Sequence, residues 1–208
     1  MGYDESQYSL PRWEDLSISR QTVYDNTFRK APSQGWMFLP LTAYHSPDPA
    51  ALFEPLEQHL AEYRFGLAQY LSAGVAACYR GFRLFDSQSS RAVVKSWVRF
   101  YKKYRDILNA DIIHVTRPTM QDLDCFLHVN PQGGKVRGLL VVFNPTQARR
   151  TKTLPIPLYY TGLTKTARVS GPSEDGGYSR LTLGRDYKVN IKVDLQPSSI
   201  QYFIIKSG

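Results

Sequence analysis

The chain has 208 residues, of which 42% are hydrophobic and 13% aromatic, so it can bury a sizeable core and is neither disordered nor of low complexity. No apolar run approaches the roughly 20 residues that span a bilayer, and the sequence starts without the apolar stretch of a signal peptide, so we expect no membrane partner and leave the compartment open. Two cysteines cannot form a disulfide scaffold, and we expect Cys78 and Cys125 to be buried free thiols.

The formal charge of +8 is distributed unevenly along the chain. Residues 1–115 contain 13 Lys and Arg against 12 Asp and Glu, a net charge of +1, whereas residues 116–208 contain 13 against 6, a net charge of +7. We therefore divide the chain into a domain at 1–110 and a domain at 111–208. The basic half is either a solvated strand face or a surface for an anionic partner. No nucleic-acid-binding motif is present, so we expect no nucleic acid partner.

The first domain is predicted to contain strand, helix, strand and helix in that order. The runs at 35–45 and 74–81 are short and apolar, which is typical of buried strands. Apolar residues at steps of three and four predict helices at 52–72 and 90–108, the second with Ser90 as its N-cap. This order is typical of a parallel α/β unit, whose functional site lies at the C-terminal ends of the strands.

The second domain changes to a period of two. Residues 186–195 alternate without a break, so that Tyr187, Val189 and Ile191 face one way and the polar residues between them face the other. Further strand candidates lie at 111–116, 124–130, 137–144, 151–158, 166–170, 178–183 and 200–206. About eight short strands separated by turn residues predict an antiparallel β-sandwich. The expected fold class is therefore α/β followed by all-β.

The absence of several motifs argues against most of the common classes of enzyme. The sequence contains no Walker phosphate loop, dinucleotide-binding glycine fingerprint, paired CxxC, HExxH or nucleophile elbow. Its four histidines lack ligand-like spacing with cysteine, so we expect no metal site.

The junction between the two domains resembles a known family. A helix with WVRFYKKYRDIL (97–108) leads directly into an all-β domain that contains LLVVFNPT (139–146) and IPLYYTGL (156–163). Over residues 35–208 this order resembles the C-terminal end of a retaining glycoside hydrolase of the α-galactosidase-like kind. The resemblance implies a (β/α)₈ barrel whose last helix leads into a C-terminal β-sandwich. It also implies hydrolysis of a glycosidic bond by two carboxylates, with no cofactor and no metal.

The chain is too short for the whole of that architecture. A complete barrel takes about 250 residues, so residues 1–115 can hold only a few strand–helix units. We therefore expect a partial (β/α) barrel-like segment plus a C-terminal antiparallel β-sandwich: the C-terminal portion of a glycoside hydrolase-like carbohydrate-active protein, inactive alone. Its exposed barrel surface would favour self-association. The alternative is a non-catalytic module that binds a carbohydrate, or another partner, through the sandwich.

The candidate site residues follow the strand candidates of the first domain, where a barrel places its substrate. Asp25 comes after a strand candidate at 20–24 and is the candidate catalytic carboxylate, unless it is a turn residue. Tyr44 and His45 end the run at 35–45 and would bind a sugar ring, unless they only cap a loop.

Three further features have two interpretations each. Arg80 ends the run at 74–81 and would bind substrate, unless it anchors the next loop through an ion pair. Asp86, in the loop beyond, would bind substrate too, unless it only favours the N-terminus of the following helix. In the sandwich, Tyr159 and Tyr160 form either a sugar-stacking platform or part of the core, and we expect core packing.

Overall fold

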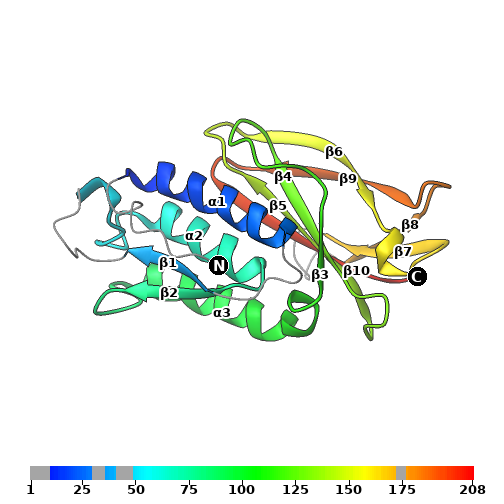
Figure 1. The fold of residues 1–208 in the computed structure, drawn as a ribbon, viewed down its shortest axis with the longest axis horizontal. Helices are drawn as coiled ribbons and strands as arrows, with labels where there is room; N and C mark the ends of the chain where they lie inside the picture. The colour runs from blue at the N-terminus through cyan, green and yellow to red at the C-terminus, as the bar shows by residue number, and fades with distance from the viewer. Residues whose placement is uncertain (1–9, 30–35, 41–48, 172–176) are drawn as a thin grey trace. The chain divides into compact units, whose positions relative to one another are not determined.

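The structure is a computed structural model that describes residues 10–29, 36–40, 49–171 and 177–208. The chain divides into two compact units (Figure 1). The first consists of Met1–Arg29 with Ser33–Arg105, and the second of Lys30–Pro32 with Asp106–Gly208. We describe each unit by itself.

The first unit follows the predicted order, with one further helix before it. Its elements are α1 (Arg12–Arg29), β1 (Trp36–Pro40), the short 3₁₀ helix η2 (Pro49–Ala51), α2 (Leu60–Ser72), β2 (Ala76–Arg80) and α3 (Gln88–Leu108). β1 and β2 pair in parallel, with Trp36 opposite Ala76 and Pro40 opposite Arg80. The predicted strand–helix–strand–helix unit with parallel strands is therefore confirmed.

The strand candidate at 20–24 is wrong, because these residues lie inside α1. The start of this helix is marked in the sequence. Proline at 11 precedes its first residue, and Glu14 and Asp15 lie in its first turn, where the helix dipole favours negative charge. The backbone N–H of Asp15 donates to the Pro11 carbonyl at 3.0 Å, the first hydrogen bond of the helix. The strand candidate at 20–24 did not take these helix signals into account.

Two predicted helix starts are also corrected. α2 begins at Leu60 rather than at 52, since Pro55 disfavours helical geometry at the residue before it. The N-cap of α3 is Ser87 rather than Ser90. The Ser90 amide donates to Ser87 Oγ at 3.1 Å, and the Ser87 amide donates back to Ser90 Oγ at 3.0 Å. This reciprocal pair is a capping box, with the N-cap three residues before Ser90 and the first helical residue at Gln88.

α1 is tied to α2 and to the segment before it. The buried Tyr70 hydroxyl donates to Ser19 Oγ at 3.0 Å. The Arg12 guanidinium donates to the carbonyl oxygens of Ala50 at 3.0 Å and Leu52 at 2.8 Å. These hydrogen bonds join α1 to α2, to η2 and to Leu52, so the extra helix belongs to the same packed unit.

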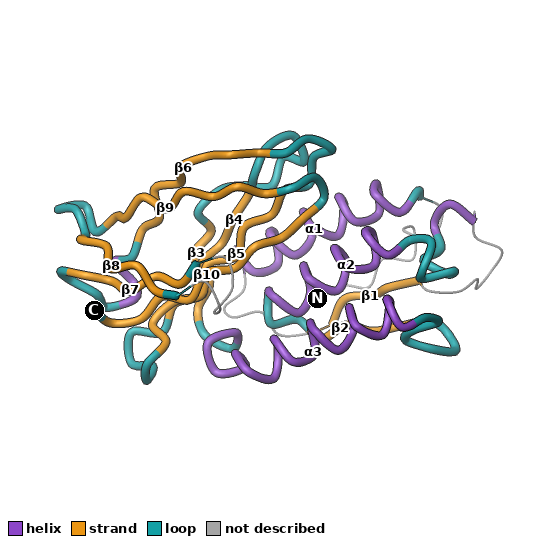
Figure 2. Tube along the Cα trace, turned by 180° about the vertical axis from the view of Figure 1, so that it is seen from behind, coloured by secondary structure: helices purple, strands orange, loops and turns teal. Residues whose placement is uncertain are grey.

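The second unit is an antiparallel β-sandwich. A six-stranded sheet has the order β3-β4-β5-β10-β7-β8, and a two-stranded sheet pairs β6 with β9 (Figure 2). The strands are β3 (Asp111–His114), β4 (Asp124–Val129), β5 (Val136–Asn144), β6 (Arg150–Pro157), β7 (Thr166–Ser170), β8 (Tyr178–Thr182), β9 (Lys188–Leu195) and β10 (Ser199–Ser207). The predicted sandwich of about eight strands is confirmed.

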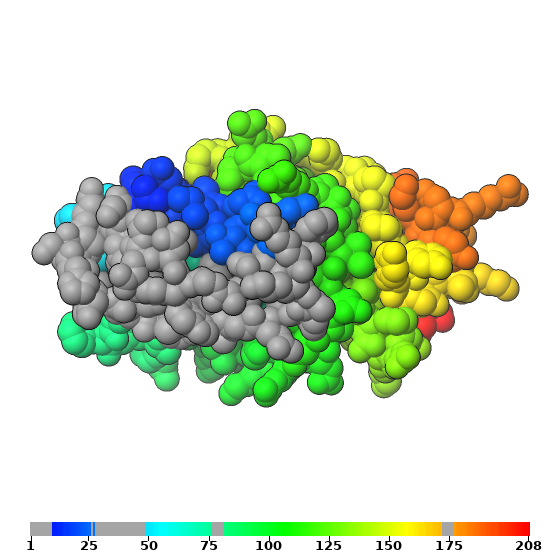
Figure 3. Space-filling model, in the orientation of Figure 1, coloured from blue at the N-terminus to red at the C-terminus, as the bar shows by residue number. Residues whose placement is uncertain are grey.

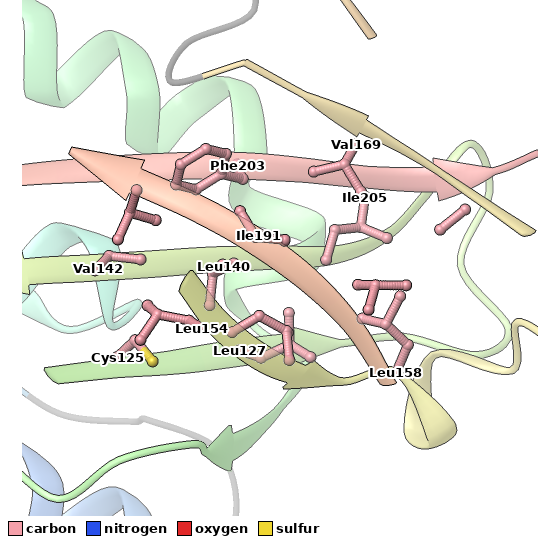
Figure 4. Close-up of a cluster of buried hydrophobic side chains, with 14 of the residues drawn as sticks. Cys125, Leu127, Leu140, Val142, Leu154, Leu158, Val169, Ile191, Phe203 and Ile205 are labelled. Carbon is pink, nitrogen blue, oxygen red and sulfur yellow. The ribbon is translucent and has the colours of Figure 1, made fainter. Parts of the chain in front are cut away.

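The core of the sandwich lies between its two sheets. Apolar side chains of both sheets form one buried cluster, seen in Figure 4, with Leu140 and Phe203 from the larger sheet and Leu154 and Ile191 from the smaller. In β9 the expected alternation is present, since every second residue from Val189 is buried. The alternation in β9 therefore places its apolar side chains in this cluster.

The structure describes the side chain of one of the two cysteines. Cys125 is a buried free thiol in the sandwich core, as expected. Cys78 lies in β2, and its side chain is outside the described residues.

One buried asparagine joins the ends of three strands. Asn144, the last residue of β5, is fully buried, and its amide group donates to the carbonyls of Ala148 at 2.8 Å, Gln196 at 2.8 Å and Leu195 at 3.3 Å. Its side-chain oxygen accepts the Thr146 amide at 3.1 Å and the Thr146 hydroxyl at 2.8 Å. Asn144 thereby holds the start of β6 and the end of β9 to the end of β5.

We expect Asn144→Ala to lower the free energy of unfolding by about 2–4 kcal/mol, because it removes the hydrogen bonds of a buried amide and leaves the buried Leu195 carbonyl without this donor. Urea unfolding followed by circular dichroism measures this loss. Asn190→Ala is the matched control, because Asn190 is exposed in β9, and it should change stability by less than about 0.5 kcal/mol. Equal losses in the two variants would contradict the role of Asn144.

Candidate functional site

The parallel register of β1 and β2 brings their C-terminal ends to one edge. Pro40 lies opposite Arg80, so the chain leaves both strands at the same level. Tyr44 and His45, which follow β1, lie outside the described residues, as does the side chain of Arg80. In parallel α/β proteins this edge is where substrates bind. The loop at 81–87, which follows β2, is the part of the edge that the structure shows in detail.

Two contacts hold this loop against the segment around the start of α2. The Tyr63 hydroxyl donates to the Leu84 carbonyl at 2.9 Å. Arg83 Nε donates to Glu54 Oε1 at 3.3 Å, in an ion pair at the surface. The loop is therefore anchored rather than free, although it belongs to no helix or strand.

Asp86 is a third anchor of the same loop. Its carboxylate accepts a hydrogen bond from the Ser90 hydroxyl at 2.9 Å and one from the Glu57 amide at 3.3 Å. Burial acts to raise the pKa of Asp86, but these hydrogen bonds outweigh it and hold the pKa below its usual value. The contacts support the interpretation that Asp86 stabilises the start of α3, while its binding of substrate stays a prediction.

The anchored loop presents apolar side chains to solvent. Phe82 is 97% exposed, and Phe85 and Leu84 are 44% and 37% exposed. We call these three residues the apolar loop. The Arg91 guanidinium lies 5.6 Å from the Phe85 ring centroid, close enough for a cation–π contact. Neighbouring exposed apolar side chains of this kind mark interaction surfaces.

Asp25 does not follow a strand. It is a half-buried residue of α1, so the reason for choosing it, a position past a barrel strand, is wrong. Its role as a catalytic carboxylate therefore has no support from the local fold.

A buried polar cluster, which the sequence interpretation missed, joins α1 and α2. Asp15, Ser19 and Arg20 of α1 and Gln69 and Tyr70 of α2 are each at most 1% exposed. Burial, with the Asp15 carboxylate nearby, raises the pKa of Tyr70, so its phenol stays protonated and donates to Ser19. The available signal was the spacing of Asp15 and Ser19, which places two polar residues on one helix face.

On the sandwich, Tyr159 and Tyr160 are exposed, so the expected core packing is wrong. Their side chains are 60% and 57% exposed. They lie in the 3₁₀ helix η3 (Tyr159–Thr161), which follows β6. Because a 3₁₀ turn repeats every three residues, the buried Leu158 and Thr161 point inward and the two tyrosines between them point outward.

These tyrosines belong to a small aromatic group. The Tyr159 ring meets the Tyr160 ring edge to face at 5.2 Å, and it meets the Tyr187 ring in the same way at 5.2 Å. Figure 3 shows yellow and orange segments of the sandwich beside each other at the surface. The group is an exposed aromatic platform of the kind that stacks on apolar faces of ligands.

Two classes of feature are not found in the described parts of the chain. Among these residues, no group of three or more His, Cys, Asp or Glu side chains is arranged to hold a metal ion. The same residues contain no helix with the length and apolar character needed to cross a membrane.

We expect Asp86→Ala to lower the free energy of unfolding at pH 7 by about 1 kcal/mol, through the lost hydrogen bonds at the start of α3. The depressed pKa of Asp86 means that its contribution is present above the ordinary carboxyl pKa of about 3.9 and is lost as pH falls through the folded-state pKa. Thermal unfolding at pH 7 and pH 3 measures this, with a smaller difference at pH 3. Asp106→Ala, at the exposed far end of α3, is the control and should not destabilise. A difference that persists unchanged at pH 3 would contradict the prediction.

No protein-family model matches the chain, and no curated protein matches it in sequence. Solved structures are similar to it in fold. A GH27 β-L-arabinopyranosidase from Geobacillus stearothermophilus matches with a TM-score of 0.61 and 11% identity, over 96% of this chain and 43% of that one. An Anoxybacillus α-amylase matches with a TM-score of 0.57 and 10% identity, over 100% of this chain and 51% of that one.

A third structure is a putative α-N-acetylgalactosaminidase from Bacillus halodurans, with a TM-score of 0.54 and 12% identity, over 94% of this chain and 44% of that one. The chain thus spans about half the length of the structures that it matches, or less. At such low identities the likeness concerns the fold alone. The chain is similar in fold to a part of glycoside hydrolases, as the resemblance in its sequence implied.

Proposed function

We propose that the chain is the C-terminal portion of a glycoside hydrolase-like carbohydrate-active protein, and that it is inactive alone. In this proposal residues 1–110 form the end of a barrel and residues 111–208 form the sandwich that supports it. The observation that carries it is the sheet of the first unit. Among the described residues β1 and β2 pair only with each other, whereas parallel sheets are normally larger and covered on both faces.

The carboxylates of the first unit support the same proposal. Hydrolysis of a glycosidic bond requires two carboxyl groups about 5–10 Å apart on either side of the bond. Asp86 is engaged by Ser90 and Glu57, and Asp25 lies on a helix rather than at a strand end. We infer that the reacting carboxylates belong to strands beyond β1 and β2. A pair of carboxylates requires neither a cofactor nor a metal.

In this proposal the exposed apolar loop contacts further barrel elements of the complete protein. Phe82, Leu84 and Phe85 lie just past the C-terminal end of β2, where further barrel elements would cover or adjoin them. Within the described ranges no further strand pairs with β1 or β2, so their outer edges would favour pairing with other chains. We therefore propose that the chain by itself self-associates through this part of the first unit.

Size-exclusion chromatography with light scattering, followed by assay of each peak with nitrophenyl glycosides, tests the proposal. We expect the wild-type chain to self-associate, the variant Phe82→Ser/Phe85→Ser to shift toward monomer, and no peak to release nitrophenol. Tyr159→Ser/Tyr160→Ser removes two exposed aromatic residues of the sandwich and is the matched control, which should still self-associate. A monomeric wild-type chain that hydrolyses a glycoside, and loses that activity in Asp25→Asn, would overturn the proposal.

A second candidate function is a non-catalytic carbohydrate-binding module. One observation favours it: Tyr159 and Tyr160 are exposed on the sandwich and held edge to face, with Tyr187 supporting Tyr159. Aromatic rings in fixed orientations can stack on the apolar face of a neutral sugar. Such a ligand would be bound, not cleaved.

Affinity electrophoresis in gels that contain amylose or galactomannan distinguishes this candidate. If the sandwich binds neutral glycans, one gel retards the wild-type chain, and Tyr159→Ala/Tyr160→Ala weakens binding about tenfold, equivalent to roughly 1.4 kcal/mol. Phe82→Ala/Phe85→Ala removes two exposed rings elsewhere and should bind like wild type. If neither amylose nor galactomannan changes the migration of the wild-type chain, this candidate function is eliminated.

A further inference from the structure

Three cations lie side by side on the outer face of the six-stranded sheet. Lys206 of β10 is opposite Arg168 of β7, and Arg168 is opposite Arg180 of β8. The adjacent Ile205 and Val169 point into the sandwich core, as Figure 4 shows. Since side chains alternate along a strand, the three cations lie on the opposite face. We call Lys206, Arg168 and Arg180 the basic ladder.

The basic ladder concentrates positive charge. Neighbouring strands are about 4.8 Å apart, and like charges directly opposite each other destabilise a sheet. Arg168 and Arg180 are exposed and Lys206 is half-buried. Among the described residues, none of these three cations forms an ion pair. Elsewhere in the sandwich, surface ion pairs join Arg149 with Asp194, Lys152 with Asp122, and Lys188 with Asp186.

A tyrosine holds two of the cations in place without neutralising them. Lys206 Nζ lies 4.3 Å from the ring centroid of Tyr178, and the Arg168 guanidinium carbon lies 5.3 Å from it. Such cation–π contacts restrain long side chains while their charge stays available. The ladder is therefore a partly organised cluster of positive charge, within a half of the chain whose net charge is +7.

We infer that the basic ladder binds an acidic polysaccharide, with carboxylate or sulfate groups of the glycan on its cations. Both arginines can pair with either anion through two parallel hydrogen bonds. A nucleic acid is less well matched, because Tyr178 is occupied by the two cations and is not free to stack on a base, as single-strand-binding surfaces require. The inference concerns a different face from the aromatic platform, and it stands or falls independently of the proposed hydrolase portion.

Fluorescence anisotropy of the full chain with labelled acidic oligosaccharides tests the inference. Oligogalacturonate supplies carboxylates, sulfated dextran oligosaccharides supply sulfates, and neutral dextran is the uncharged reference. We expect at least one acidic probe to bind and neutral dextran not to bind. Arg168→Gln/Arg180→Gln should weaken binding at least tenfold. Lys95→Gln/Arg99→Gln removes two exposed charges from α3, and the affinity should stay within twofold of wild type.

The outcomes distinguish binding at the basic ladder from a general effect of net charge. They also distinguish an acidic glycan from other polyanions. Equal losses in the two double variants would show a general charge effect and overturn the inference, as would binding of neither acidic probe. A single-stranded oligonucleotide could bind more tightly than both acidic oligosaccharides and lose affinity in the same double variant. That result would overturn the assignment to a glycan. The variant Arg168→Lys/Arg180→Lys keeps the positive charge but lacks the guanidinium groups that form two parallel hydrogen bonds. It replaces the glutamine variant in this test if the glutamine variant does not fold. We expect it to weaken binding about threefold, and unchanged affinity would contradict the paired hydrogen bonds.

Discussion

The sandwich depends on the hydrogen bonds of one buried side chain. Asn144 lies where the chain passes from the larger sheet to the smaller after β5 and returns to the larger sheet after β9. Both passages leave carbonyl groups without strand partners, and the amide of Asn144 donates to them. These hydrogen bonds hold both passages in the geometry in which the faces of the two sheets pack on each other.

The two units are stabilised in different ways. The sandwich has a closed apolar core between its sheets, so it contains what an antiparallel domain needs to fold. The first unit has a small parallel sheet, an exposed apolar loop around Phe82, and buried polar side chains such as Asp15 and Arg20 between helices. These features suit a part of a larger α/β architecture. The same contrast supports the proposal of an end of a barrel joined to its supporting domain.

Three surfaces of the molecule have distinct chemistry. The edge past β2 has an anchored loop and apolar side chains, which suit contact with further protein. The platform around Tyr159 offers aromatic rings, which suit the apolar face of a neutral sugar. The ladder around Arg168 offers positive charge, which suits an anionic chain. Each surface is anchored by its own contacts, so variants of one should leave the others intact.

The order of elements could be read from the sequence because its signals are local. A period of two specified β9, with its alternation from Val189, whereas β4 and β5 were indicated by short apolar runs between turn residues. Parallel pairing of β1 with β2 followed from the strand–helix–strand order. The missed helix at 12–29 also had local signals, which are Pro11 before its first residue and Glu14 and Asp15 in its first turn.

The candidate surfaces were decided by the tertiary structure. One turn of 3₁₀ helix exposed Tyr159 and Tyr160, although the apolar residues around them indicated a core. The basic ladder joins residues 168, 180 and 206, which only the pairing of three strands brings together. The sequence by itself determined the elements, because hydrophobic periodicity acts within a few residues. Strand register and turn geometry depend on contacts between distant segments, so only the folded chain decides which side chains share a surface.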